Sequence, residues 1–277
     1  MNKKSKLVLI LLLLVVTLPA GIVAFAAIGE ETQSPTSQQI YESTEKVVIP
    51  RETLERIKAF DPAGYERHLA DYKQTIVELR ISHKLQAKIE DLLEEGYSLT
   101  EILVGYEFLS LNFGTIEQLQ ELLDKKQDGD AWANLFVAYH RDHPPFSPRS
   151  FDSGLLEQLM NAPLLNADDI MIADRISFVT GKAVEEIFES RKAGTPWHEI
   201  TSEAGILFGD DKLPRVQVTN DQLQKLQNQT GWTDDRITAA IVTAHQAGQE
   251  PEKVVEKLKR GTREEAILAE AYETKHR

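Results

Sequence analysis

Hydrophobic residues recur at helical spacing along most of the chain after residue 82. In the segment KIEDLLEEG, Ile89 and Leu93 fall on one face of a helix, and Gly96 is placed to end it. Ser98 can then begin the next helix as its cap, with Glu101 reaching back in a capping box. No stretch shows the sustained alternation of hydrophobic and polar residues that marks a β-strand. The pattern predicts an all-α protein.

Three sets of residues recur about every 67 positions. The sets are Gly114, Gly181 and Gly248; Ile102, Ile170 and Ile237; and Gly129, Gly194 and Gly261. A fixed interval of this kind is the signature of tandem repeats. We therefore predict three tandem units of about 67 residues, at 83–145, 152–213 and 219–277, each of about four short helices. Together they would form a helical repeat array or bundle.

Polar residues that can cap helices precede the expected helices. Further capping boxes are predicted at Thr115–Gln118 and Thr262–Glu265, and single caps at Asp130, Asn166, Thr195 and Thr233. Pro196 would then take the first position of its helix, where a missing N–H costs nothing. Proline- and glycine-containing breaks at 141–154 and 207–218 separate the three units.

A hydrophobic segment follows three lysines at the N-terminus. The basic start, the apolar run and the sequence Ala24-Phe25-Ala26 are typical of a signal peptide at 1–26, cleaved after its last alanine. An uncleaved anchor helix at 7–28 is the alternative, because about 20 apolar residues can span a bilayer. In either case we expect the rest of the chain to lie outside the cytoplasm.

Two further segments precede the first unit. Residues 27–46 are mostly polar and predict a flexible linker. Residues 47–82 predict a helical lead-in that caps the first unit, with Asp61 capping and Pro62 beginning a long helix.

Composition narrows the possible functions. The chain has no cysteine, which excludes disulfides, thiol nucleophiles and cysteine zinc sites. Its 31 basic and 44 acidic residues give a net charge of −13. Such a surface repels nucleic acid, whose binding depends on neutralising phosphates. We expect no nucleic-acid partner.

The segment WHEITSEAGI (Trp197 to Ile206) resembles the first helix and turn of a DNA-binding helix-turn-helix. In that family the turn leads into a recognition helix that enters the major groove. Here the continuation, LFGDDKLPRVQV, has two acids, a glycine and a proline where the basic helix should begin. The resemblance ends at the part that would contact DNA.

A wider resemblance covers residues 83–275. Its markers are GYSLTEIL at Gly96 to Leu103 and TGKAVEEIFESRKAGTPWHEI from Thr180. These are similar to tandem helical repeats of exported, functionally uncharacterised proteins from Gram-positive, spore-forming-type bacteria. The resemblance implies the fold and an extracytoplasmic location, and it transfers no functional residue.

His140 and His143 stand three positions apart on one helical face, and such a pair can contribute to a zinc site. A third ligand is not recognisable nearby, so we interpret the pair as a polar helix end. Pairs of adjacent acids occur at Glu94–Glu95, Asp168–Asp169, Glu185–Glu186, Asp210–Asp211, Asp234–Asp235 and Glu264–Glu265. Many of them fall in the first turns of expected helices, where negative charge is favourable.

Trp132 and Trp197 occupy the same place in two units, where the third unit has Glu264. Their helical spacing predicts core positions. The chain lacks a G-x-S-x-G elbow, a P-loop and a G-x-G-x-x-G fingerprint. We therefore assign no catalytic, cofactor-binding or metal-binding residue.

The sequence thus favours an exported, non-enzymatic binding or scaffold module of the cell envelope, with a protein or cell-wall partner. Two alternatives stay open. One is a wall-acting hydrolase that uses acidic residues in a groove between repeats. The other is a membrane-anchored sensor or assembly factor, if the N-terminal segment is not cleaved.

Overall fold

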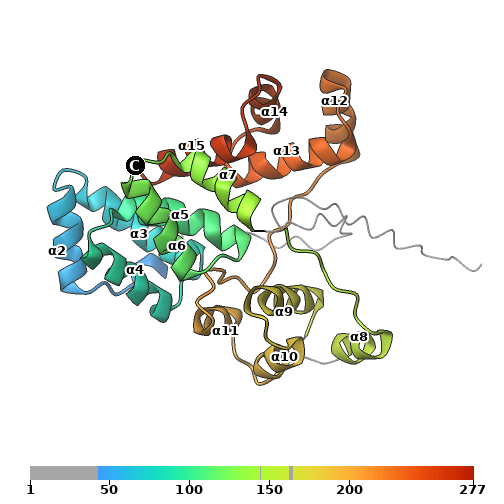
Figure 1. The fold of residues 1–277 in the computed structure, drawn as a ribbon, viewed down its shortest axis with the longest axis horizontal. Coiled ribbons are helices and arrows are strands. Elements are labelled where there is room, and N and C mark those ends of the chain that lie inside the picture. The colour runs from blue at the N-terminus through green and yellow to red at the C-terminus, as the bar shows by residue number, and fades with distance from the viewer. Residues whose placement is uncertain (1–42, 144, 162–164) are drawn as a thin grey trace, which may run out of the picture.

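The all-α prediction is confirmed by a computed structural model, which describes residues 43–143, 145–161 and 165–277. Within these ranges the chain forms helices and no strand (Figure 1). None of the described helices is long and apolar enough to cross a bilayer. The predicted signal peptide at 1–26 and the anchor at 7–28 lie outside the described residues.

Within each group the helices follow one another with short connections, and longer segments separate the groups. Two of them form the lead-in, α2 (Arg51–Phe60) and α3 (Tyr65–Glu78). The first group of four is α4 (His83–Glu95), α5 (Leu99–Asn112), α6 (Ile116–Gln127) and α7 (Trp132–Asp142). The second group is α8 (Ser153–Met160), α9 (Ala167–Thr180), α10 (Val184–Lys192) and α11 (Trp197–Glu203). The third group is α12 (Asn220–Thr230), α13 (Asp234–Gln246), α14 (Pro251–Lys259) and α15 (Glu264–Lys275).

Several helices begin at the predicted caps. Thr115 and Gln118 form a full capping box at α6. Asn166 caps α9 and Thr233 caps α13 through their side chains. Ser98 caps α5, but the Glu101 carboxylate accepts from the Ser98 hydroxyl instead of from its backbone amide.

Three predicted caps are each wrong by one residue, namely Asp130, Thr195 and Thr262. The N-caps of α7, α11 and α15 are the residues that follow these three, and none of them caps through its side chain. Before each predicted cap stands a glycine with a positive φ, and the amide of the residue after that glycine bonds back to a carbonyl five positions earlier. That residue therefore closes the preceding helix and cannot open the next.

Two other local predictions fail. Pro62 does not begin a helix, because residues 62–64 form a turn in which the Gly64 amide donates to Asp61 (3.0 Å). Gly181 and Gly248 take the left-handed conformation, but beside Gly114 it is Phe113 that does so, with a φ of 55°. The Phe113 ring stacks on Phe208 at 4.2 Å, a contact that holds this residue in place.

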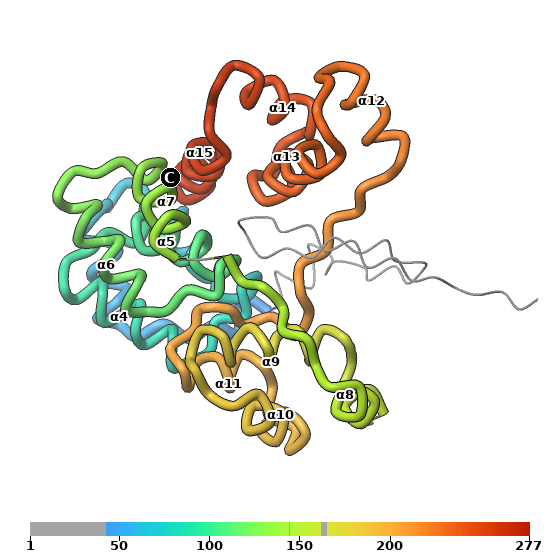
Figure 2. The backbone as a smooth tube through the Cα atoms, turned by 45° about the vertical axis from the view of Figure 1, so that its right-hand side comes forward, coloured from blue at the N-terminus to red at the C-terminus, as the bar shows by residue number. Residues whose placement is uncertain are grey.

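The third group returns to the first instead of extending a row. Helix α15 packs against α7 and α5, and its Leu268 and Tyr272 belong to the same core as the lead-in and α4 to α7. Figures 1 and 2 show α8–α11 and α12–α15 on either side of the first group. A linear array has contacts only between neighbours. The packing of α15 departs from that arrangement.

His276 binds the C-terminal end of α15 to α3 and α5. Its buried ring contacts Asp71 Oδ2 through Nδ1 (2.9 Å) and Glu107 Oε2 through Nε2 (2.7 Å). Burial opposes the charged form, but the hydrogen bonds to these two carboxylates outweigh it and leave the pKa of His276 above its ordinary value. The charged imidazole thus links α15 to α3 and α5.

Replacing His276 by Gln should therefore destabilise the protein in a pH-dependent way. A raised pKa adds stability that is fully present below the unfolded pKa of about 6.5 and is lost as the pH rises through the folded value. At pH 6 we expect the loss of this buried pair to cost on the order of 3 kcal/mol, with a smaller cost at pH 9. Urea unfolding at both pH values measures the difference.

The exposed His83 provides the control. His83→Gln should leave the free energy of unfolding unchanged at both pH values. An equal loss at pH 6 and pH 9 for His276→Gln would show that folding does not raise the pKa of this imidazole.

Candidate binding groove

A groove of about 650 Å³ lies between the α3–α4 junction and helices α9 to α11. One side is formed by residues 80–84, and the other by side chains of α9, α10 and α11 and of the turns between them. Residues from Thr180 onward, which resemble part of a helix-turn-helix in sequence, therefore form a wall of this groove. Residues 207–218 form no helix, so nothing follows α11 in the place of a recognition helix.

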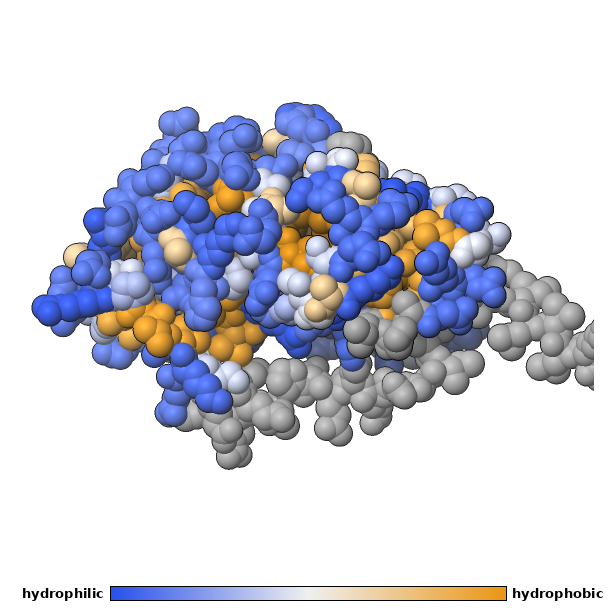
Figure 3. All heavy atoms as spheres, turned by 90° about the horizontal axis from the view of Figure 1, so that it is seen from below, coloured by the Kyte–Doolittle hydropathy of each residue, from blue (hydrophilic) through white to orange (hydrophobic). Residues whose placement is uncertain are grey.

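The groove has an apolar floor and a charged rim. Ile81, Ile176 and Ile187 are buried at its base. Exposed side chains of both signs stand at its edge, among them Lys182 and Glu199. The face of the molecule seen from below is mostly hydrophilic, with separate hydrophobic areas between polar side chains (Figure 3).

A salt bridge joins the two sides of the groove. Lys84 Nζ of α4 lies 3.0 Å from Glu203 Oε2 of α11, and both side chains are largely exposed. Exposed pairs of this kind contribute little stability, so the contact can open at small cost.

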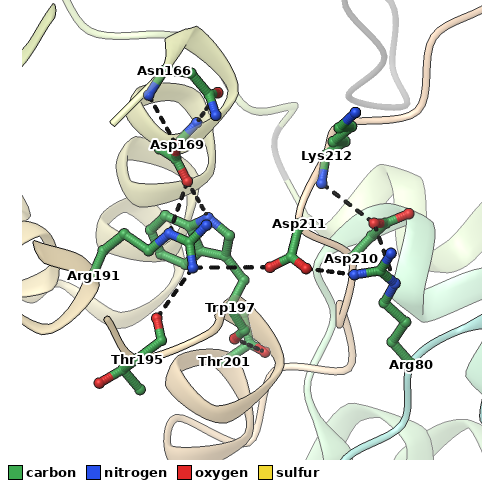
Figure 4. Close-up of polar contacts among 10 residues, drawn as sticks. All are labelled: Arg80, Asn166, Asp169, Arg191, Thr195, Trp197, Thr201, Asp210, Asp211 and Lys212. Carbon is green, nitrogen blue, oxygen red and sulfur yellow. Dashed lines mark hydrogen bonds and ion pairs between the residues drawn. The ribbon is translucent and has the colours of Figure 1, made fainter. Parts of the chain in front are cut away.

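The inner wall depends on a buried carboxylate, Asp169, at the start of α9 (Figure 4). One oxygen accepts from the indole N–H of Trp197 (2.7 Å) and from Nε of Arg191 (2.9 Å). The other accepts from the backbone amide of Asn166 (2.9 Å). These donors belong to α9, α10 and α11, so one buried charge ties three helices together.

Arg191 extends the link to the groove itself. Its guanidinium lies over the Trp197 ring, 5.4 Å from the centroid, and NH1 donates to the carbonyl of Thr195 (3.3 Å). Thr195 lines the groove. The turn between α10 and α11 is thus positioned by the same carboxylate that holds the two helices.

The segment after α11 attaches this wall to the first group of helices and to Arg80. The Ile116 amide donates to the carbonyl of Gly205, and the Leu207 amide to that of Gly114, both at 2.9 Å. Further along, Arg80 pairs with Asp211 and lies 3.7 Å from Asp210 (Figure 4).

A close backbone approach accompanies these bonds. A Cβ atom on Gly209 would lie 2.6 Å from the carbonyl oxygen of Arg80 and 2.7 Å from that of Leu79. Only glycine lets the two chain segments come this close. The spacing between the two sides of the groove is therefore fixed by main-chain contact.

The acid pairs serve mainly as helix starts. Four of the six lie in the first turns of α9, α10, α13 and α15, where negative charge was predicted. Glu94–Glu95 instead ends α4, and Asp210–Asp211 lies in the segment after α11. Sequence reasoning missed the arginine partners, such as Arg215 Nη2 at 2.8 Å from Asp168 Oδ1. These partners are far along the chain, so local spacing gives no sign of them.

The rings of His140 and His143 bond to different partners. The oxygen of the Gln118 amide accepts from Thr115 and Tyr139, so its nitrogen donates to His143 Nε2 (2.9 Å). Nδ1 of His143 must then carry the proton that it shares with the Tyr139 carbonyl. His140 Nδ1 contacts Glu265 Oε1 (3.1 Å). In the described ranges no three such side chains are arranged to hold a metal ion.

The two tryptophans take equivalent places. Trp132 and Trp197 are each the first residue of their helix, α7 and α11, and both are buried, as predicted for core positions. Glu264 takes the first position of α15. Trp232 is only partly buried, with Arg236 over its ring at 3.9 Å.

Removing the buried charge should weaken the groove wall. In Asp169→Asn the amide cannot neutralise Arg191, which is itself mostly buried, so we expect a loss on the order of 3 kcal/mol in the free energy of unfolding. Asp168→Asn is the matched control, because its partner Arg215 is about half exposed. Its cost should stay below about 1 kcal/mol. Urea unfolding followed by circular dichroism measures the free energy of unfolding of both variants. Equal losses for Asp169→Asn and Asp168→Asn would contradict the role given to Asp169.

A scan against models of protein families gives no match for this chain, and neither does a search of curated proteins or of solved structures. What the groove can bind is therefore inferred from its own side chains, charges and dimensions.

Proposed function

We propose that this chain is an exported, non-enzymatic binding module of the cell envelope, with the groove beside α10 and α11 as its binding site. The observation that carries the proposal is the groove itself, a preformed concave surface whose walls are tied together by Asp169, Arg80 and Gly209. Binding sites in proteins are mostly concave, largely apolar and formed before the ligand arrives.

The chemistry of the groove favours a peptide segment of a partner protein. The buried isoleucines offer apolar contact to side chains, and the rim offers both charges, from Lys182 and from Glu186 and Glu199. A peptide presents both kinds of group along its length. A polyanion such as nucleic acid would face three glutamates in this groove, including Glu203.

The repeat hypothesis belongs to this proposal. Each group of four helices has one positive-φ glycine before its last helix, at Gly129, Gly194 and Gly261, and the amide that follows it closes the preceding helix in the same way. An identical turn at the same place supports three copies of one module. The resemblance to exported helical-repeat proteins points the same way.

Two alternatives remain as proposals of lower rank. A wall-acting hydrolase needs one carboxyl group kept protonated, commonly by burial, beside a second, ionised one. Glu186, Glu199 and Glu203 are all exposed at the groove, which favours binding over hydrolysis. A membrane-anchored sensor requires that the segment 7–28 stays in place.

Site-specific crosslinking tests the groove. A photoreactive benzoylphenylalanine at Glu199 should give a discrete protein adduct in intact cells, whereas the same group at the exposed Asp221 of α12 should give none. Ser190→Trp places a large side chain at an exposed position in the groove and should abolish the adduct. Gln224→Trp on α12 is the matched control and should leave it intact. An adduct that survives Ser190→Trp, or forms equally at Asp221, would count against the groove.

N-terminal sequencing of the exported protein tests its location. Cleavage after Ala26 predicts a mature chain that starts at Ala27. An intact Met1 in the membrane fraction would favour the anchored sensor, and an intact Met1 in the cytoplasm would contradict export.

A further inference from the structure

Some of the charged side chains that line the groove already have partners in the protein. Lys84 pairs with Glu203 across the groove (3.0 Å). Arg80 pairs with Asp211 and also lies 3.7 Å from Asp210. These charges are neutralised by their own neighbours, so they contribute little to the choice of a ligand.

Three other charged groups of the lining are unpaired. In the part of the chain that the structure describes, no ion pair or hydrogen bond involves the ammonium group of Lys182 or the carboxylates of Glu186 and Glu199. All three side chains belong to exposed residues. Two carboxylates against one ammonium group leave an excess of negative charge in the groove. That excess favours a cationic ligand over an anionic one.

Each of the two carboxylates stands beside an isoleucine that lines the same groove. Glu186 precedes Ile187 on α10, and Glu199 precedes Ile200 on α11. Ile187 is buried, and Ile200 is partly buried. Two helices thus present the same combination of an acid and an apolar side chain. A complementary ligand carries basic groups next to apolar ones.

Both carboxylates also lie in the first turn of their helices, where negative charge is favourable. This interaction acts through the field of the helix and leaves the exposed carboxylate oxygens able to bind a cation. Glu185 shares the first turn of α10 with Glu186 but does not line the groove. Comparing the two glutamates therefore separates a role in the helix from a role in binding.

The charge of the whole chain acts in the same direction. The net charge of −13 attracts a basic ligand at long range, which raises the rate of encounter. The unpaired carboxylates then contact it in the groove. An acidic ligand is repelled at both stages.

We propose that the groove binds a basic, amphipathic segment of a partner protein. Its lysines or arginines pair with Glu186 and Glu199, and its apolar side chains lie on the isoleucine floor. This inference rests on the function proposed for the groove and names the chemistry of the partner.

Fluorescence anisotropy with the full exported chain tests the preference on three labelled peptides that differ only in charge. The peptide GKLLGKLLG should bind saturably, and its neutral counterpart GQLLGQLLG at least about 10-fold more weakly, because two exposed ion pairs are lost. The acidic counterpart GELLGELLG should bind more weakly still. Added salt should narrow these differences, since it screens exposed charges.

Variants locate the binding of the lysine peptide. Glu186→Gln and Glu199→Gln should each weaken it by about 3-fold, and together by about 10-fold. The matched control combines Glu185→Gln with Asp221→Asn, at two exposed first-turn acids outside the groove. It removes the same total charge and should leave the affinity unchanged. Urea unfolding of both double variants measures any separate effect on stability.

Equal affinity for the lysine and glutamine peptides, or an equal loss in the control pair, would overturn the basic preference. Absence of saturable binding by the lysine peptide would also overturn it. Neither result decides whether the groove binds a protein, because the crosslinked adduct in cells tests that function without assuming any charge of the partner.

Discussion

One buried negative charge holds α9, α10 and α11 in their arrangement. Taking a carboxylate out of water costs several kcal/mol unless charged and polar donors replace the lost solvent. Asp169 meets this condition with an indole, a guanidinium and a backbone amide. Because these donors come from different helices, α10 and α11 cannot move away from α9 without leaving a charge unpaired. The groove wall that they form is thereby rigid before any ligand binds, and a preorganised site loses less entropy on binding.

The helices were predictable because helical spacing and caps are local properties. Ile89, Leu93 and Gly96 take the roles that their spacing predicts. The prediction misplaced the caps at Asp130, Thr195 and Thr262. Each of these residues follows a left-handed glycine, and its amide still bonds to a carbonyl of the preceding helix, so the next helix begins one residue later. The groove was not predictable. Arg80 and Asp211 are 131 residues apart, and neither residue carries a local sign that they meet.

Helix α9 supports the groove with both its apolar and its acidic residues. Its Ile176 contributes to the apolar floor. Its acids hold neighbouring segments, since Asp168, Asp169 and Asp174 each pair with an arginine from another part of the chain. These three carboxylates therefore serve the structure, and none of them lines the groove.

The return of α15 to α5 and α7 ties the last helix of the chain to the first group of helices. In an open solenoid each unit contacts only its neighbours, so unfolding can proceed from one end. Here Leu268 and Tyr272 of α15 share a core with α4 to α7, and removing α15 would expose part of that core, including the ring of Phe136. We therefore expect α15 and the first group to unfold together.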